Sequence, residues 1–249
     1  SFISILLVTN KKNEHFLFFF LLFCLVTVLL SGERSSFLKF LLMFFIFFIF
    51  FKNKLNLLNY KKSISIVAIF FSIIIYLNGS VIKERYFGMI SFSHNQNLSL
   101  IDKYLTSQYG AHSIVSFFIF KDNLLLGAGN KSFRFECEKY SLEVKQIQTK
   151  IDDNLDYYSS GCSTHPHQIY NELTSEHGII GTLLVLLLVS KLLLTKIFKE
   201  KLSLLNIVSL LYIATVFLPI LPSGSFFSTF NSTLIWVNFL FYLVKSDKQ

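Results

Sequence analysis

The stretch GCSTHPHQIYNELTSEHGIIGTLLVLLLVSKLLL, residues 161–194, contains the change in character that decides the fold. It is polar as far as Gly178, and the run that follows, residues 179–194, is almost entirely apolar. A membrane-crossing helix needs roughly 20 apolar residues, or somewhat fewer when flanking lysines and aromatic side chains reach the interface. We therefore expect residues 179–194 to cross a membrane and the polar residues before them to lie outside it.

The composition of the whole chain agrees with a membrane protein. Of its 249 residues, 53% are hydrophobic, only 15% are charged and 30 are Phe, and the mean hydropathy is +0.55. A soluble domain has about a quarter of its residues charged, and here the apolar residues are also gathered in runs. The net charge of +8 comes largely from lysines beside those runs. This distribution indicates membrane topology and argues against nucleic acid as a partner.

Six apolar runs are candidate spans: residues 16–30, 37–51, 64–77, 179–194, 202–221 and 226–244. The polar stretch between the third and the fourth run is too long for a simple turn. We therefore predict an all-α integral membrane protein, a multi-span helical bundle with a large extramembrane loop. Its transmembrane helices occupy residues 1–77 and 179–249, and the loop occupies residues 78–178.

The positions of the lysines orient these spans. They lie before the first span, between the second and third, near the end of the fourth and beyond it, and after the sixth, as Lys11, Lys12, Lys52, Lys54, Lys61, Lys62, Lys191, Lys196, Lys199, Lys201, Lys245 and Lys248. If the spans alternate strictly, all these lysines fall on one side, which the positive-inside rule assigns to the cytoplasm. Residues 31–36, the long loop and residues 222–225 then face outward together, and the partner of the chain is the lipid bilayer.

The beginning of the chain suggests a longer protein. Ser1 opens inside an apolar run, and no charged leader followed by a small-residue cleavage site is visible. We expect the chain to be the C-terminal part of a protein with further N-terminal helices, without a signal peptide.

Two of the three cysteines, Cys137 and Cys162, lie in the predicted outward loop. An oxidising compartment favours a disulfide, which would stabilise the loop by about 3 kcal/mol. Zinc held together with His165 and His167 is the alternative, but the spacing lacks a CxxC or HxxxH pattern. We predict the disulfide and no metal.

His167 is the leading candidate for chemistry on physical grounds. Pro166 suits the first turn of a helix, where its missing N–H would be unpaired anyway, and residues 163–165 offer capping side chains. A helix beginning here would place His167 in its first turn, on one polar face with Tyr170, Asn171 and Thr174. The positive end of the helix dipole favours a neutral, proton-accepting imidazole and attracts phosphate oxygens. The alternative is a histidine that only caps the helix or packs at the interface.

Three motifs, in this order along the chain, resemble those of the O-antigen ligase family. His167-Gln168, nine residues, then Gly178-Ile-Ile-Gly181 is similar to the signature of that family, including the preceding HPH. FKDNLLLGAGNKSFRFEC, residues 120–137, resembles its GxGxxxF stretch, and SGERSSFL, residues 31–38, resembles its short Ser-Arg motif between two spans. All three fall on the predicted outward side, and together they cover most of the chain.

The resemblance implies a GT-C-like membrane fold on the periplasmic side of the bacterial inner membrane. It implies transfer of a glycan from undecaprenyl diphosphate to lipid A–core, with inversion and without a metal ion, a nucleotide or another cofactor. His167 matches the general base that deprotonates the acceptor hydroxyl. Arg34 matches the arginine that binds the diphosphate as it leaves, and paired charged hydrogen bonds suit a guanidinium to that role. The alternative for Arg34 is a juxtamembrane anchor.

The chain departs from the family at one position of the phosphate site. The family has a second arginine before the GxGxxxF stretch, whereas this chain has SQYGAHSIVSFFIF, residues 107–120, with a histidine and no arginine. His112, Arg85 or Arg134 could take the place of that arginine, and the alternative for each is an ordinary loop residue. The second half of the phosphate clamp is therefore left open.

Three further residues are candidates for substrate binding. Asn171 shares the expected polar face, and Glu172 and Glu176 could bind sugar hydroxyls or assist His167, unless they are only exposed helix charges. The glycines of residues 127–130 do not indicate a nucleotide site, because the flanking strand and the lysine of a P-loop are missing. A tight turn in the loop is the better interpretation.

Other functions remain open from the sequence. An O-antigen polymerase and a protein O-oligosaccharyltransferase share the signature region with the ligases. A transporter or a non-catalytic membrane scaffold is the alternative of another class, and a transporter would carry charged or broken helices at mid-span. The spans here are nearly free of charge, and the polar motifs gather in the loop, which favours an enzyme at the membrane surface.

Overall fold

The computed structural model describes residues 14–51, 69, 72–73, 76, 79–80, 98–153, 155, 158–199, 202–219 and 221–244. Within these ranges the regular secondary structure is helical throughout, with no strand. The prediction of an all-α fold is confirmed for this part of the chain. Of the predicted span 64–77, only Ile69, Ser72, Ile73 and Tyr76 are described, and all four are helical. The remainder of that span lies outside the described residues.

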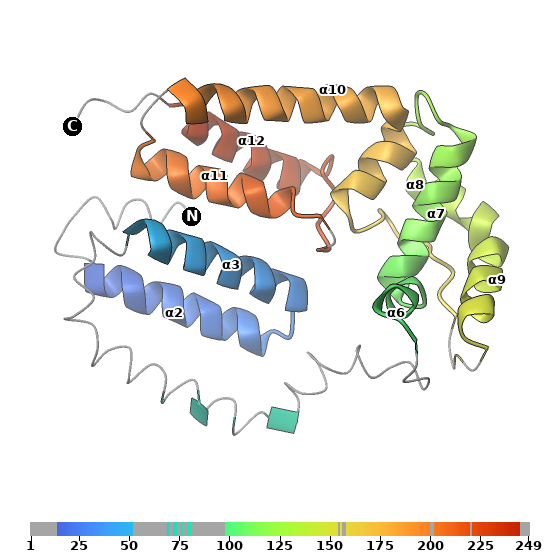
Figure 1. Cartoon of the computed structure of the whole chain (residues 1–249), viewed down its shortest axis with the longest axis horizontal. Helices are drawn as coiled ribbons and strands as arrows, with labels where there is room; N and C mark the ends of the chain where they lie inside the picture. Colours follow the sequence, from blue (N-terminus) through green and yellow to red (C-terminus); the bar gives the residue numbers. More distant parts are fainter. Residues whose placement is uncertain are drawn as a thin grey trace.

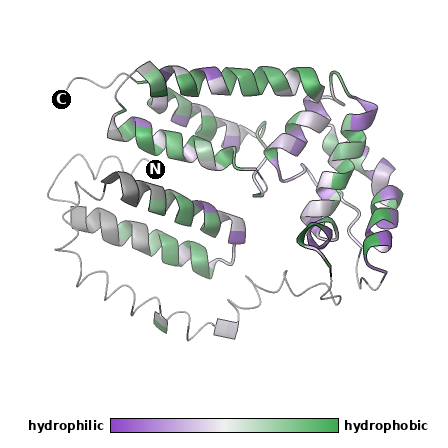
Figure 2. Ribbon diagram, in the orientation of Figure 1, coloured by the Kyte–Doolittle hydropathy of each residue, from purple (hydrophilic) through white to green (hydrophobic). Residues whose placement is uncertain are grey.

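Five apolar helices run alongside one another and form the larger part of the molecule (Figure 1). They are α2 (Glu14–Leu30), α3 (Arg34–Phe51), α10 (Ile169–Lys199), α11 (Leu204–Val216) and α12 (Thr229–Leu243). The residues of these helices that Figure 2 colours are predominantly apolar, except in the first turns of α10. The start of α2 and the ends of α3, α10 and α12 lie at the same end of this group (Figure 1). Helices α2 and α3 therefore run in opposite directions, as do α10 and α11 and then α11 and α12, whereas α3 and α10 run in the same direction.

One helix in the described part of the chain, Ile169–Phe198, is long and apolar enough to cross a membrane, and an 18-residue window within it has a mean hydropathy of 2.3. The helix Leu205–Val216 is apolar but shorter. Large apolar side chains are exposed on α10 and α12. Among them are Leu183, Leu184 and Leu187 on α10 and Phe230 and Leu240 on α12. Exposed apolar surface of this extent marks contact with a membrane or another protein.

A second group of helices lies at the opposite end (Figure 1). It consists of α6 (Leu100–Leu105), α7 (Gln108–Asp122), α8 (Phe133–Glu136), the 3-10 helix η3 (Cys137–Tyr140) and α9 (Ser141–Ile151). Ser99 and Ser107 cap α6 and α7 with their side chains, and α9 is amphipathic, with Val144 and Gln148 buried. These helices come from the stretch predicted to be the extramembrane loop.

Each group has its own hydrophobic core. The first core joins α10, α11 and α12 through Ile169, Leu173, Val189, Ile213, Phe226, Ile235, Phe239 and Tyr242. The second joins α7, α8, η3 and α9 through Ala111, Ile114, Val115, Ile119, Phe133, Cys137 and Val144. Helices α7 and α10 pack against each other where the two cores meet.

Helix α10 is interrupted at Gly178, whose φ of 63° and ψ of −167° are not helical. The interruption frees backbone groups, and residues 124–129 bind them. The N–H groups of Ala128 and Gly129 donate to the oxygens of Ser175 and Glu176, both at 2.9 Å. The N–H groups of Ile179 and Ile180 donate to the oxygens of Leu124 and Leu125 at 2.9 and 3.2 Å. The GxGxxxF stretch is therefore joined to the helix break through backbone hydrogen bonds.

The two glycines at this joint are required by the close approach of the two backbones. A Cβ on Gly178 would lie 2.4 Å from the oxygen of Leu125, and one on Gly127 would lie 2.3 Å from the nitrogen of His177. Both residues also have positive φ angles. Glycine is thus needed at both positions for conformation and for space.

Candidate functional site

Three imidazole rings meet where the two cores join, and we call His112, His165 and His167 the histidine cluster. The ring centroid of His167 lies 4.1 Å from that of His165 and 5.3 Å from that of His112. Tyr109, one turn before His112 on α7, places its ring 6.1 Å from His167 in an edge-on arrangement. The fold therefore brings residues more than 50 positions apart in the sequence into one group.

The conformation of His167 differs from the one predicted. Helix α10 begins at Ile169, and His167 lies before it with a φ of 53°. The prediction that Pro166 opens the helix and that His167 occupies its first turn was therefore wrong. The cause is local, because Ser163 folds back to hydrogen-bond the backbone of His165 and residues 163–165 form bends. A left-handed conformation is uncommon outside glycine, although histidine adopts it more often than most residues.

Gln168 begins the helix instead. Its side-chain oxygen accepts the N–H of Asn171 at 2.8 Å, and its backbone oxygen accepts the N–H of Glu172 at 3.0 Å. This is the arrangement of an N-cap residue. The signature thus has a physical meaning at several positions: His167 precedes the cap, Gln168 is the cap, and Gly178 is the joint.

His112 is buried in α7, with 1% of its surface exposed. Its Nδ1 lies 2.8 Å from the backbone oxygen of Gly161, which requires that Nδ1 carry the proton. Its Nε2 is then an acceptor in the neutral ring, and it is buried without a hydrogen-bond partner among the described residues. Burial lowers the pKa of His112, which keeps the ring neutral. A neutral ring with a bare acceptor is a poor replacement for a phosphate-binding arginine.

The ring of His165 is tilted relative to that of His167. The Nδ1 of His165 lies 3.0 Å from the hydroxyl of Thr164. Burial lowers the pKa of His165, and the charges of His112 and Arg134 lower it further. The influence of Arg134 places this exposed arginine of α8 in the electrostatic surroundings of the cluster. Of the two arginines proposed for the second cation, Arg134 therefore acts on the charge of the cluster, while Arg85 lies outside the described residues.

Burial lowers the pKa of His167 to about 4, together with the charges of His165 and His112. At neutral pH the ring is therefore uncharged and able to accept a proton. In the part of the chain that the structure describes, no carboxylate forms an ion pair with His167. The neutral state of His167 therefore follows from burial and from its two histidine neighbours, and not from a helix dipole alone.

Arg34 is the first residue of α3, at the end of the α2–α3 pair nearer to α6–α9 (Figure 1). Lys39, on the same helix, donates a hydrogen bond to the backbone oxygen of Pro222 at 2.6 Å. Pro222 precedes Ser223, whose N–H donates to the oxygen of His167 at 2.7 Å. A short path of contacts thus connects the helix of Arg34 to His167. The sequence analysis missed Lys39, although a lysine inside an otherwise apolar predicted span was the signal.

Glu172 and Glu176 are buried and serve as structural connectors. Glu172 accepts hydrogen bonds from the hydroxyl of Ser225 and, at 2.7 Å, from the N–H of Phe226. Glu176 accepts the N–H of Lys131 at 2.7 Å. Their exposed surfaces are only 2% and 1%, so neither is the exposed helix charge that the sequence allowed. Their carboxylates hold two loops in place, and a role of either residue in binding a sugar or assisting His167 stays a prediction.

Asn171 joins α10 to α7. Its side-chain amide donates to the hydroxyl of Ser113 at 2.8 Å, and that hydroxyl is also 2.6 Å from the hydroxyl of Tyr104. Tyr170, predicted on the same face, instead donates to the oxygen of Phe217 at 2.8 Å. The expected polar face is therefore divided between two neighbouring elements.

Cys137 and Cys162 form a disulfide, with their Cα atoms 5.2 Å apart. The bond ties η3 to the segment that leads into the histidine cluster. Gly161, next to Cys162, supplies the oxygen that binds His112. The disulfide uses both cysteines of the zinc site that the sequence offered as the alternative. Among the described residues, no group of three or more His, Cys, Asp or Glu side chains is arranged to hold a metal ion.

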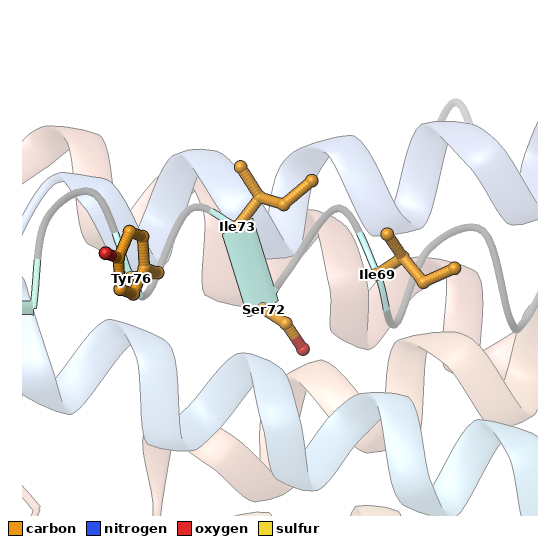
Figure 3. A pocket seen from close by; sticks show the side chains of 4 residues that line it. All are labelled: Ile69, Ser72, Ile73 and Tyr76. Atoms are coloured by element: carbon orange, nitrogen blue, oxygen red, sulfur yellow. The ribbon is translucent and has the colours of Figure 1, made fainter.

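A shallow pocket of about 510 Å³ is lined by Ile69, Ser72, Ile73 and Tyr76 (Figure 3). None of these residues belongs to the histidine cluster, and their side chains offer only two hydroxyl groups. We assign no chemistry to this pocket.

Comparison with known proteins supports the resemblance that the motifs indicated. A family model described as O-antigen ligase matches residues 19–186, which is more than half of the chain. The matched range contains the Ser-Arg motif, the GxGxxxF stretch and the histidine cluster. No curated protein and no solved structure matches.

Proposed function

The chain belongs to the O-antigen ligase family, and we propose that it transfers a glycan from undecaprenyl diphosphate to lipid A–core at the periplasmic face of the inner membrane. Family membership itself points to a membrane protein with ligase- or polymerase-like glycan transfer and lipid-linked substrates. The donor, the acceptor, the side of the membrane and the residue roles are our proposal.

The observation that carries the proposal is the position of His167 beside two further imidazoles, with ring centroids 4.1 and 5.3 Å away. Burial and two neighbouring histidines hold its pKa at about 4, so the ring is ready to accept a proton at neutral pH. A general base must be unprotonated before it reacts. The hydrogen bond from Ser223 and the cap at Gln168 fix the backbone on either side of it.

In the proposed reaction a hydroxyl of the acceptor sugar gives its proton to a ring nitrogen of His167. The hydroxyl oxygen attacks the anomeric carbon of the donor and forms the new glycosidic bond. The bond from that carbon to the phosphate oxygen breaks, and undecaprenyl diphosphate leaves with the electron pair. Attack from the opposite face inverts the anomeric centre, and no metal ion is required.

The anionic donor strengthens the base. A diphosphate beside the cluster favours the protonated imidazole and raises the pKa of His167 toward its ordinary value. Arg34 and Arg134 are the proposed cations for the diphosphate, with Arg34 approaching from α3 and Arg134 from α8. Charge stabilisation of this kind lowers the barrier because the leaving group gains negative charge in the transition state.

The test is transfer activity of His167→Ala in membranes that supply both substrates. We expect a loss of about 10²–10⁴-fold, the usual contribution of a general base. Lys150→Ala, an exposed residue of α9, is the control for expression and handling. Full activity of His167→Ala at normal expression would refute the assignment of the base.

Analysis of lipopolysaccharide and lipid-linked glycan from a deletion strain tests the type of transfer. Bare core together with full-length glycan on the carrier identifies a ligase. Core carrying a single repeat identifies a polymerase, and an unchanged ladder directs the search to protein acceptors.

A further inference from the structure

Three consecutive leucines follow α7 and project from the protein surface. Leu124, Leu125 and Leu126 have 48%, 61% and 73% of their surfaces exposed. We call these residues the leucine loop. Such a run is costly in water, and no part of the proposed chemistry uses it.

The position of the leucine loop is fixed by the break in α10. The oxygens of Leu124 and Leu125 accept the N–H groups of Ile179 and Ile180, the first two residues after Gly178. Ile179 and Ile180 begin the apolar segment of α10 and are themselves 40% and 45% exposed. The leucine loop therefore lies level with the start of the membrane-crossing segment, and Figures 1 and 2 show it as an apolar loop beside that end of α10.

Positive charges lie on both sides of the leucine loop. Lys121 precedes it on the last turn of α7, and Lys131 and Arg134 follow it; all three are exposed. The nearby carboxylate of Asp122 accepts a hydrogen bond from Tyr140 at 2.7 Å. Apolar side chains flanked by basic residues suit the boundary between acyl chains and anionic headgroups.

We propose that the leucine loop is an interfacial membrane anchor that inserts into the leaflet facing the histidine cluster, next to residues 179–180. The proposal rests on the membrane crossing of α10 in the proposed function. The partner is the lipid bilayer, because the exposed leucines continue the apolar surface of the spanning segment.

The anchor also sets the height of the reactive site above the bilayer. Ala128 and Gly129, directly after the leucine loop, bind the oxygens of Ser175 and Glu176. These residues belong to the short helical segment that starts just after His167. Insertion of the leucines therefore holds His167 at a defined distance from the lipid headgroups. The diphosphate of a lipid-linked donor lies at the level of these headgroups.

The experiment measures the depth of a fluorescent probe on single cysteines in the chain with Cys24→Ser and the native disulfide retained. The probe is placed at Leu126→Cys, with Leu125→Cys as a second position, and the protein is reconstituted in phosphatidylethanolamine–phosphatidylglycerol vesicles. Leu184→Cys is the reference in the spanning segment, and Leu142→Cys is the matched control. Leu142 is an exposed leucine of α9, with 70% of its surface accessible.

We expect spin-labelled lipids to quench the probes at 125 and 126, most strongly when the label is near the headgroup. Aqueous iodide should quench these probes several-fold less than the probe at 142. Iodide quenching equal to that at 142 would overturn the proposal. Protection from iodide without quenching by lipid labels would mean that protein covers the loop, and would overturn it as well.

The probe at 184 separates this inference from the proposed function. If lipid labels quench position 184 but not positions 125 and 126, only the anchor is refuted. If position 184 is itself open to iodide, the membrane crossing fails, and the anchor fails with it.

Discussion

The backbone N–H of Ser223 donates a hydrogen bond to the backbone oxygen of His167, with an N···O distance of 2.7 Å. This bond fixes the peptide of a residue whose φ of 53° lies in the left-handed region. The loop that supplies it is held from both sides, because Lys39 binds Pro222 and Glu172 binds Ser225 and Phe226. The conformation of His167 thus depends on α3, on α10 and on the connection between α11 and α12.

The pH dependence of transfer should reflect the low pKa of His167. Because the folded-state pKa is about 4, the ring stays neutral well below the ordinary histidine range. The acid limb of kcat/KM, which reports the free enzyme, should therefore fall only as the pH approaches this value. His165→Ala removes a neighbouring charge and opens the site to water, so it should move that limb to higher pH. An unchanged acid limb in His165→Ala would contradict the cause assigned to the shift.

The same pKa predicts how stability changes with pH. The unfolded chain binds a proton at His167 near pH 6.5, whereas the folded protein does so only near pH 4. The contribution of this group to stability is therefore complete above about pH 6.5 and is lost as the pH falls toward 4. Thermal unfolding at several pH values should show that His167→Gln loses less stability over this interval than the unsubstituted protein does. Parallel curves would argue against a buried neutral ring.

The joint at Gly178 predicts a graded response to three glycine substitutions. Gly178→Ala and Gly127→Ala introduce both backbone strain and a clash with main-chain atoms. Gly129→Ala introduces strain alone, because its Cβ would meet nothing within 4 Å. We expect the first two to lower the unfolding free energy by more than the third, whose loss should be about 1 kcal/mol. Equal melting temperatures for all three would show that the two backbones are not in close contact.

Glu172 should act on the reaction through the loop that it binds. Glu172→Ala leaves the buried N–H of Phe226 without its acceptor, which costs about 1–3 kcal/mol of stability. The loosened loop should also lower kcat, because Ser223 then holds His167 less firmly. Glu138→Ala, on an exposed position of η3, is the control. A variant with normal kcat despite a lowered melting temperature would limit Glu172 to a role in stability.

Loss of the disulfide should destabilise the loop that leads into the histidine cluster. Cys137→Ser opens a bridge between residues 25 positions apart and should cost about 3 kcal/mol. A reducing agent should have the same effect on the unsubstituted protein and no further effect on the variant. Cys24→Ser, which removes the free thiol of α2, should leave the melting temperature within error of the original.

Local sequence patterns determined the class of this protein and several of its parts. The apolar runs predicted helices, and α2, α3, α10, α11 and α12 lie where five of the six runs were expected. The spacing from His167 to Gly181 and the pairing of Cys137 with Cys162 also followed from the sequence. Patterns of this kind are readable because helix periodicity and glycine conformation depend mainly on near neighbours.

The tertiary structure alone decided how the site is built. The sequence placed His167 inside a helix, but the left-handed backbone stabilised from residues 223 and 225–226 places it before the cap. It left open whether Glu172 and Glu176 are exposed helix charges, whereas both are buried and bound to backbone N–H groups of distant loops. The neighbours His112 and Lys39 act through contacts with residues 49 and 183 positions away. Burial and such long-range contacts set the charge state of a side chain, and only the folded chain brings those partners together.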